Sequence, residues 1–113
     1  ALATLRLHDR VSLRHAPLCN VPFEDTPCYG YPPAALTGVE PQLLFIDAPP
    51  QTIGRKGVLP AVANYLKRGT TILLDDAPRD SERECVESWC RHGLARLKGY
   101  CGLGQGIAVL ESC

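Results

Sequence analysis

Two short segments, each ending on an acid, stand out in the hydrophobic pattern of the chain. Leu43–Ile46 is apolar at every position and leads into Asp47, after which the chain has prolines. Thr70–Leu74 is a second such segment and leads into Asp75 and Asp76. A short run that is apolar on both faces is typical of a strand buried in a parallel sheet. The pattern therefore predicts two neighbouring parallel strands whose C-terminal ends carry acids.

Two other segments have the period of an amphipathic helix. The first spans about 58–68, with Pro60 in its first turn, where proline is tolerated. The second spans about 81–92 and begins with Ser81 and Glu84 at the spacing of a capping box. The first helix would join the two acidic strands into a βαβ unit. The predicted buried positions of the two helices are Val58, Leu59, Val62, Tyr65, Leu66, Cys85, Val86, Trp89 and Cys90.

The N-terminal third of the chain is less regular. Ala1–Leu7 has apolar residues at helical spacing, which predicts the last turns of a helix. Val11–Leu18 alternates in its first part and is interrupted by Pro17, which predicts a strand over 11–16. Residues 19–41 contain five prolines and are predicted to form a long loop.

Two further strands, at about 94–101 and 106–111, are predicted to close the domain. The string between them, Gly102–Gly106, has a GxGxG pattern. A dinucleotide-binding loop of that pattern joins a strand to a helix, whereas Ile107–Leu110 is typical of a strand. A glycine-rich hairpin turn is therefore the predicted structure.

Composition narrows the classes of protein that the chain can belong to. The 113 residues are 45% hydrophobic and 21% charged with a formal net charge of +0, which is ordinary for one globular domain. That balance argues against capture of nucleic acid or of an anionic membrane surface. The six cysteines include no CxxC pair, so reduced thiols in a cytoplasmic protein are expected, with a disulfide framework as the alternative. Because the chain does not begin with Met, it is expected to be processed or a piece of something longer.

Asp47, Asp75 and Asp76 are the strongest candidates for chemistry. The C-terminal ends of neighbouring parallel strands share an edge, so three carboxylates would gather there and repel one another without a positive group between them. A hard divalent cation such as Mg²⁺ would supply that charge. The alternative is that these acids cap turns. Arg55 and Arg79 each follow an acidic strand end, and ion pairs with those acids are predicted.

The order of these elements resembles the C-terminal half of a class I S-adenosylmethionine (SAM)-dependent methyltransferase. The segments LLFIDAPP (Leu43–Pro50) and ILLDDAPR (Ile72–Arg79) carry the resemblance, which covers nearly all of the chain but about half of the family's fold. It implies a partial Rossmann-like α/β sheet, mostly parallel with a C-terminal antiparallel hairpin and helices on its faces. Residues 1–113 would form a single truncated domain of this kind.

The resemblance also implies roles for individual residues. In the catechol and caffeoyl-CoA type O-methyltransferases, acids at these places bind Mg²⁺ or Ca²⁺, which makes Asp47, Asp75 and Asp76 the implied metal ligands and Asp47 the implied catalytic residue. The metal would orient two oxygens of a small-molecule acceptor. Those enzymes place a lysine shortly after the first of these acids as general base, where this chain has Ala48, Pro49 and Pro50.

The implied cofactor is SAM, with Ala16, Pro17 and Leu18 facing its adenine and Asp47 also in contact with it. The family's glycine-rich loop and its ribose-binding acid would lie upstream of Ala1. The chain as given is therefore expected to bind SAM poorly and to be inactive or incomplete as an enzyme.

Two alternatives to an enzyme remain open. The first is a non-catalytic α/β module that acts by binding or oligomerisation. Without the family's first strands, the strands at 11–16 and 43–47 would pair directly or leave apolar edges, and such edges recruit other chains, so a homodimer is predicted. The second is a small flavodoxin-like phosphate-binding or nucleotide-binding domain, which the lack of a glycine-rich strand-to-helix turn disfavours.

Overall fold

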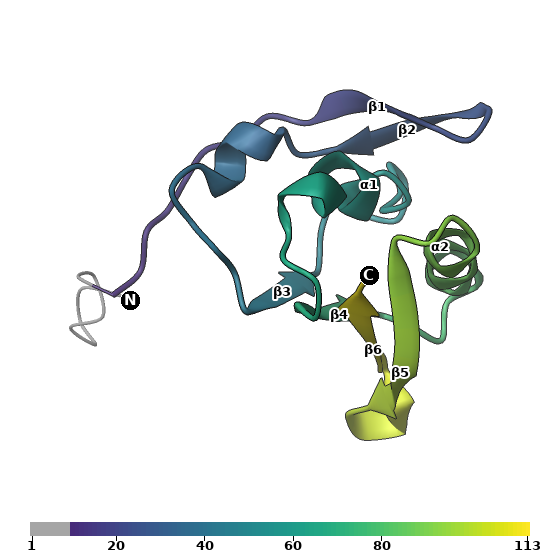
Figure 1. Cartoon of the computed structure of the whole chain (residues 1–113). Coiled ribbons are helices and arrows are strands. Elements are labelled where there is room, and N and C mark those ends of the chain that lie inside the picture. The colour runs from purple at the N-terminus through teal and green to yellow at the C-terminus, as the bar shows by residue number, and fades with distance from the viewer. Residues whose placement is uncertain (1–9) are drawn as a thin grey trace.

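The computed structural model describes residues 10–113, so the helical turns predicted for Ala1–Leu7 lie outside the described residues. Within them, the chain forms two β-sheets and two α-helices (Figure 1). The strands are β1 (Cys19–Phe23), β2 (Thr26–Gly30), β3 (Leu43–Ile46), β4 (Thr71–Asp75), β5 (Ala95–Cys101) and β6 (Ile107–Ser112). The α-helices are α1 (Val58–Val62) and α2 (Asp80–Arg91), and short 3-10 helices are η1 (Pro33–Leu36), η2 (Ala63–Tyr65) and η3 (Leu103–Gln105).

The expectation of a partial Rossmann-like, mostly parallel sheet is wrong. The larger sheet has the strand order β3-β4-β6-β5, and only β3 and β4 pair in parallel. The pairs β4–β6 and β5–β6 are antiparallel. The reason is the short connection Gly102–Gly106, which turns β6 back along β5 and lets it lie between β5 and β4. The protein is a small α/β fold with one mixed sheet of four strands and one antiparallel hairpin, β1–β2.

The N-terminal part differs most from prediction. The strand predicted over 11–16 is absent, because this mostly exposed segment pairs with no described strand. The loop predicted over 19–41 contains the hairpin β1–β2, in which Pro22 lies opposite Pro27. In an antiparallel ladder, every second pair exchanges no backbone hydrogen bonds. Two facing prolines fit such a pair because neither has an N–H to lose.

The helices follow prediction in place but not in detail. The helix predicted over 58–68 is short, because α1 ends at Val62 and passes into η2. The second helix lies where it was predicted, and Cys85, Val86 and Trp89 form its buried face. Its capping box does not form, because Arg79 is the N-cap residue and makes no side-chain cap bond.

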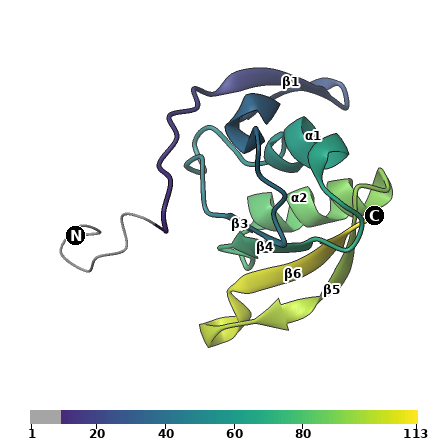
Figure 2. The ribbon, with the colours of Figure 1, turned by 60° about the vertical axis from the view of Figure 1, so that its left-hand side comes forward.

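Both helices cover the same face of the four-stranded sheet (Figure 2). The core between the helices and the sheet contains side chains from α1, α2, β4 and β6. The side chains without exposed surface include Leu59, Ile72, Leu74, Trp89 and Leu110. Burial raises the pKa of the Cys85 thiol to about 12, as expected for a cysteine inside this core. None of the six cysteines, all of which are described, forms a disulfide. In the part of the chain that the structure describes, no helix combines the length and apolarity needed to cross a membrane.

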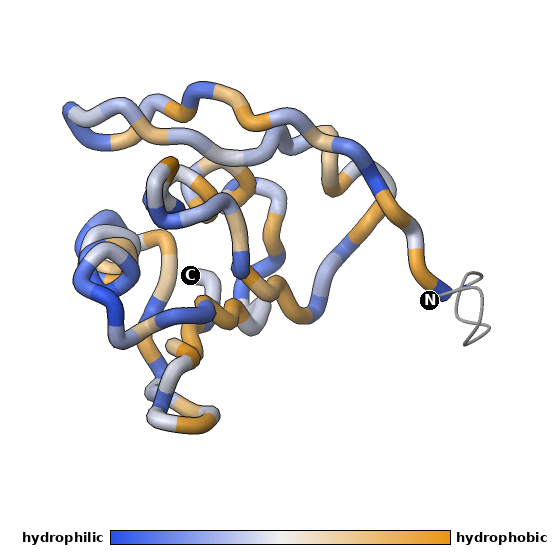
Figure 3. The backbone as a smooth tube through the Cα atoms, turned by 180° about the vertical axis from the view of Figure 1, so that it is seen from behind, coloured by the Kyte–Doolittle hydropathy of each residue, from blue (hydrophilic) through white to orange (hydrophobic). Residues whose placement is uncertain are grey.

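The opposite face of this sheet carries several apolar side chains and is uncovered by any described helix. Strand alternation and register place Leu43, Phe45, Leu73, Ile107 and Val109 on it, and we call it the open face. The hydrophobic character of these strands is visible along the backbone (Figure 3). Leu43 is 53% exposed and Phe45 48% exposed, so the prediction that this strand is buried on both faces is wrong. The cause is the position of β3 at the edge of the sheet.

The hairpin β1–β2 packs over α1 through a close backbone approach. A Cβ atom on Gly57 would lie 2.6 Å from the Tyr29 carbonyl oxygen, and one on Gly30 would lie 2.6 Å from the Gly57 carbonyl oxygen. Both positions therefore require glycine.

The tip of the hairpin is fixed by Glu24, which accepts four polar contacts that we call the hairpin clamp. Lys56 Nζ lies 2.6 Å from Glu24 Oε1. Ser88 Oγ and Arg91 Nη2 donate to Oε2 at 2.7 and 2.8 Å. His92 Nε2 lies 2.9 Å from the same oxygen.

Candidate functional site

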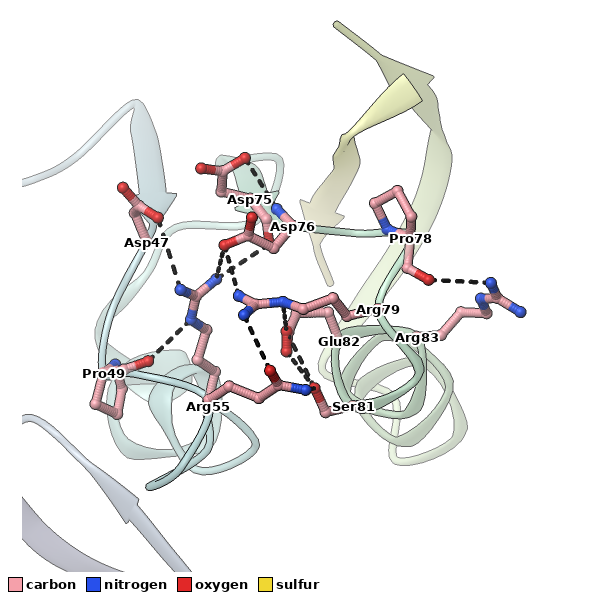
Figure 4. Close-up of polar contacts among 11 residues, drawn as sticks. Asp47, Pro49, Arg55, Asp75, Asp76, Pro78, Arg79, Ser81, Glu82 and Arg83 are labelled. Atoms are coloured by element: carbon pink, nitrogen blue, oxygen red, sulfur yellow. Dashed lines mark hydrogen bonds and ion pairs between the residues drawn. The ribbon is translucent and has the colours of Figure 1, made fainter. Parts of the chain in front are cut away.

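The predicted gathering of the three acids is confirmed by the structure. Asp75 is the last residue of β4, Asp76 follows it, and Asp47 directly follows β3. Because β3 and β4 are parallel and in register from Leu43↔Thr71 to Ile46↔Leu74, their ends meet. One oxygen from each acid lies within 4.8 Å of the others (Figure 4). We call Asp47, Asp75 and Asp76 the acidic rim.

The Arg55 guanidinium lies among these acids and confirms the predicted ion pairing. Its Nη2 is 3.6 Å from Asp47 Oδ1, and its Nη1 is 3.3 Å from Asp76 Oδ2. The same group donates to two backbone carbonyls, from Nε to Pro49 at 3.0 Å and from Nη1 to Asp75 at 3.1 Å (Figure 4). The side chain is only 5% exposed, so it is a buried cation that binds the ends of both strands.

Arg79 binds the rim from its other side. Its Nη2 donates to Asp76 Oδ2 at 2.6 Å, and its Nη1 donates to Gln51 Oε1 at 3.2 Å. Its Nε lies 3.1 Å from Glu82 Oε2, close enough for an ion pair but without the geometry of a hydrogen bond. Asp76 thus shares one carboxylate oxygen between two arginines.

Glu82 is the residue of this neighbourhood whose contact sequence reasoning missed. It lies in the first turn of α2, where an acid suits the helix dipole. Its side chain is only 2% exposed and faces Arg79. The signal that could have found this contact is the i,i+3 spacing of Arg79 and Glu82.

Two rim carboxylates keep oxygens that no arginine binds tightly. Asp47 is 59% exposed, and its contact with Arg55 is the longest ion pair of the group. Asp75 forms no ion pair with any side chain of residues 10–113, and its Oδ1 accepts a hydrogen bond from the Asp76 amide at 2.9 Å. Three acids against two arginines leave the rim with a formal charge of −1. The rim can therefore accept hydrogen bonds from a ligand that carries hydroxyl or amino groups.

The rim fits a divalent cation poorly as it stands. Its oxygens are close enough for shared ligation, but the buried guanidinium of Arg55 already lies between Asp47 and Asp76. A metal bound by all three acids would be in repulsive contact with that charge. Ligation of Mg²⁺ by Asp47, Asp75 and Asp76 stays a prediction, and no chemical step below is routed through a metal.

Of the residues implied for SAM, Ala16 alone lines a cavity beside η1 and α1. This cavity has a volume of about 560 Å³, and its mostly apolar walls include Tyr31, Leu36, Leu44 and Val62. Pro17 and Leu18 are exposed, and Asp47 belongs to the rim instead. The four residues therefore do not form one continuous pocket, and their contact with a cofactor stays a prediction.

Arg14 closes one side of this cavity, a role that the sequence did not signal. Its Nη1 donates to the carbonyl oxygens of Ala35 at 3.1 Å and Thr37 at 2.6 Å. These bonds hold the extended N-terminal segment against η1, and Arg14 itself is part of the cavity wall.

Comparison of the chain with models of protein families, with curated proteins and with solved structures finds no match. The geometry of the acidic rim and of the apolar cavity is therefore the basis for a functional assignment.

Proposed function

We propose that the acidic rim is the acceptor-binding end of an O-methyltransferase-type site, to which this chain contributes Asp47 and its supporting arginines. The observation that supports the proposal most directly is the meeting of Asp47, Asp75 and Asp76 at the C-terminal ends of two parallel strands. Ligands of α/β sheets bind at such ends. The acceptor would be a small molecule with hydroxyl groups.

Asp47 is the catalytic residue in this proposal. When bound, SAM would supply an electrophilic methyl carbon, which an oxygen nucleophile attacks while the sulfur leaves as a neutral thioether. The exposed Asp47 carboxylate accepts a hydrogen bond from the acceptor hydroxyl and takes its proton as the new carbon–oxygen bond forms. Arg55 holds Asp47 in place, and that orientation supplies part of the rate enhancement. Ala16, Pro17 and Leu18 contact the adenine.

The proposal is tested by amide NMR titration of the chain with SAM and, separately, with catechol. We expect weak SAM binding with shifts centred on Ala16 and Leu18, and catechol-induced shifts centred on Asp47 and Asp75. Asp47→Asn should abolish the catechol shifts and keep those from SAM. The matched control is Glu87→Gln, an exposed acid on α2, which should change neither. Catechol shifts that survive Asp47→Asn, or that lie away from the rim, would refute the assignment.

A second candidate function, assembly with another copy of this chain, is favoured by the bare edge of β3. This strand contains no charge, proline or bulge, which are the usual protections of an edge strand. A two-fold axis at Leu44 would pair β3 with itself in antiparallel fashion. It would also place Leu43 of each copy opposite Phe45 of the other on the open face, so that two pairs of exposed apolar side chains come into contact.

Sedimentation equilibrium tests this assembly over a range of protein concentrations. We expect a monomer–dimer equilibrium that Phe45→Lys shifts strongly to monomer. Tyr65→Lys changes another exposed aromatic, which lies outside the sheet, and should leave the equilibrium unchanged. A monomer at every concentration, or equal effects of the two substitutions, would rule out the β3 edge as the interface.

A further inference from the structure

We infer that Arg55 is the resident cation of the acidic rim and that the rim binds no divalent metal while Arg55 is present. The resemblance of the sequence implied a metal bound by Asp47, Asp75 and Asp76. The guanidinium of Arg55 lies in contact with two of these acids and provides the charge that such a metal would provide. This inference concerns the rim alone and holds whether or not methyl transfer takes place there.

The burial of Arg55 supports a permanent rather than an occasional contact. A surface arginine beside an acid exchanges its partner for water at little cost. The Arg55 side chain is 5% exposed and its donors are met by four acceptors, two from carboxylates and two from backbone carbonyls. Withdrawing the guanidinium to admit a metal would leave a buried cation and two carbonyl groups without partners.

The two carbonyl contacts also give Arg55 a task that a metal ion would perform poorly. The Pro49 carbonyl follows β3 and the Asp75 carbonyl ends β4, so one planar group spans both strand ends (Figure 4). The fixed fork of a guanidinium can meet such separated acceptors at once. Arg55 is therefore a positioning residue that sets the spacing of Asp47 from Asp75.

The inference predicts that removal of this charge opens the site to metal. In Arg55→Met, the pairing of β3 with β4 still brings the three carboxylates to one edge of the sheet, but the buried positive charge is lost. We expect this variant to bind Mn²⁺ at least about tenfold more tightly than the parent chain. Arg55→Lys keeps the charge and should gain no metal affinity.

Electron paramagnetic resonance titration with Mn²⁺, repeated with Mg²⁺ as competitor, measures these affinities on the full chain. The parent chain and its Asp75→Asn variant should bind Mn²⁺ equally weakly and without saturation. Arg79→Met is the matched control, because it removes a rim arginine that is 34% exposed and leaves Arg55 in place, so it should gain no affinity.

Three outcomes would overturn the inference. The first is saturable Mn²⁺ binding by the parent chain that Asp75→Asn abolishes, and this measurement stands even if Arg55→Met fails to fold. The second is a folded Arg55→Met that gains no affinity, with folding checked by circular dichroism. The third is an equal gain in Arg79→Met. These titrations contain no SAM and no acceptor. A result that refutes the inference about Arg55 would therefore leave the methyl-transfer proposal untouched, and the reverse also holds.

Discussion

The acidic rim and the hairpin clamp are charge clusters of opposite construction. At the rim, one buried cation, Arg55, contacts two acids and two carbonyls. At the clamp, one acid, Glu24, meets Lys56 and three further polar side chains. The clamp thus has more donors than acceptors, whereas the rim has carboxylate oxygens to spare.

This difference separates a structural cluster from a candidate site. Both Glu24 oxygens are in close contact with protein groups, so a ligand would have to displace them. At the rim, Asp47 and Asp75 keep oxygens that can bind a ligand without breaking a short contact. Carboxylate oxygens that have no close protein partner are therefore a better guide to a binding site than the number of charged groups in a cluster.

The largest effect on stability is expected where the rim loses its cation. Arg55→Met should lower the free energy of unfolding by about 3 kcal/mol, because the Pro49 and Asp75 carbonyls lose their buried donor. The double variant Arg79→Met/Glu82→Gln, which leaves no buried charge without its partner, should cost about 1 kcal/mol, since Arg79 is partly exposed. Urea denaturation measures both values. Equal losses would show that burial does not distinguish the two arginines.

The next largest effect on stability is expected where the hairpin β1–β2 packs against α1, because this packing brings Glu24 close to its partners in the hairpin clamp. Gly57→Ala places a methyl group 2.6 Å from the Tyr29 carbonyl oxygen, so the hairpin must move away from α1. Overpacking of this kind costs about 2 kcal/mol. Gly30→Ala should behave alike, because its Cβ would meet the Gly57 carbonyl oxygen at the same distance. Unchanged thermal denaturation of both variants would contradict the close approach.

The clamp itself should be visible as a pH dependence. The donor Lys56, followed by Ser88 and Arg91, holds the pKa of Glu24 well below its ordinary value of 4.5, against the effect of burial. A lowered folded-state pKa means that the stabilisation is complete above the unfolded value and is lost as pH falls through the folded value. Stability of the parent chain should therefore decline below about pH 4.5, and Glu24→Gln should remove that part of the decline.

Hydrogen exchange locates this effect within the chain. In Glu24→Gln, the amides of β1 and β2 should exchange faster at neutral pH, while those of β4 and β6 keep their protection. Uniform acceleration across both sheets would mean that the clamp supports the whole fold rather than the hairpin.

The smallest effect is expected at Glu84, an exposed residue of α2 that pairs with Lys56 at 3.1 Å. An ion pair at the surface contributes little, because water screens the charges. Glu84→Gln should therefore change the free energy of unfolding by less than about 0.5 kcal/mol. A loss near the value of a helix cap, about 1 kcal/mol, would show that Glu84 forms the predicted capping box in solution.

Sequence patterns predicted the parts of the molecule that depend on neighbours in the chain. The strand at Leu43–Ile46, the acids that follow it and the buried face of α2 were identified because alternation, period and chain order are local properties. The gathering of Asp47 with Asp75 followed from the pairing of successive parallel strands.

The errors arose where distant segments meet. Nothing local indicates that β6 lies between β4 and β5, so the predicted sheet had too many parallel pairs. Pro22 and Pro27 suggested a loop, because their compatibility with a strand depends on which partner faces them. The bond from Ser88 to Glu24 joins residues 64 positions apart, and no spacing rule reaches that far.

The peptide that joins Arg55 to Lys56 has a mechanical consequence. These consecutive side chains leave the backbone for different destinations, one for the strand ends and one for the hairpin tip. The carbonyl of Lys56, which belongs to the next peptide, accepts a hydrogen bond from Trp89 Nε1 at 2.8 Å, and this bond fastens the same segment to α2. Residues 55 and 56 therefore connect three parts of the molecule: the four-stranded sheet, the hairpin β1–β2 and α2. A shift of this short segment would change the distance between the two sheets.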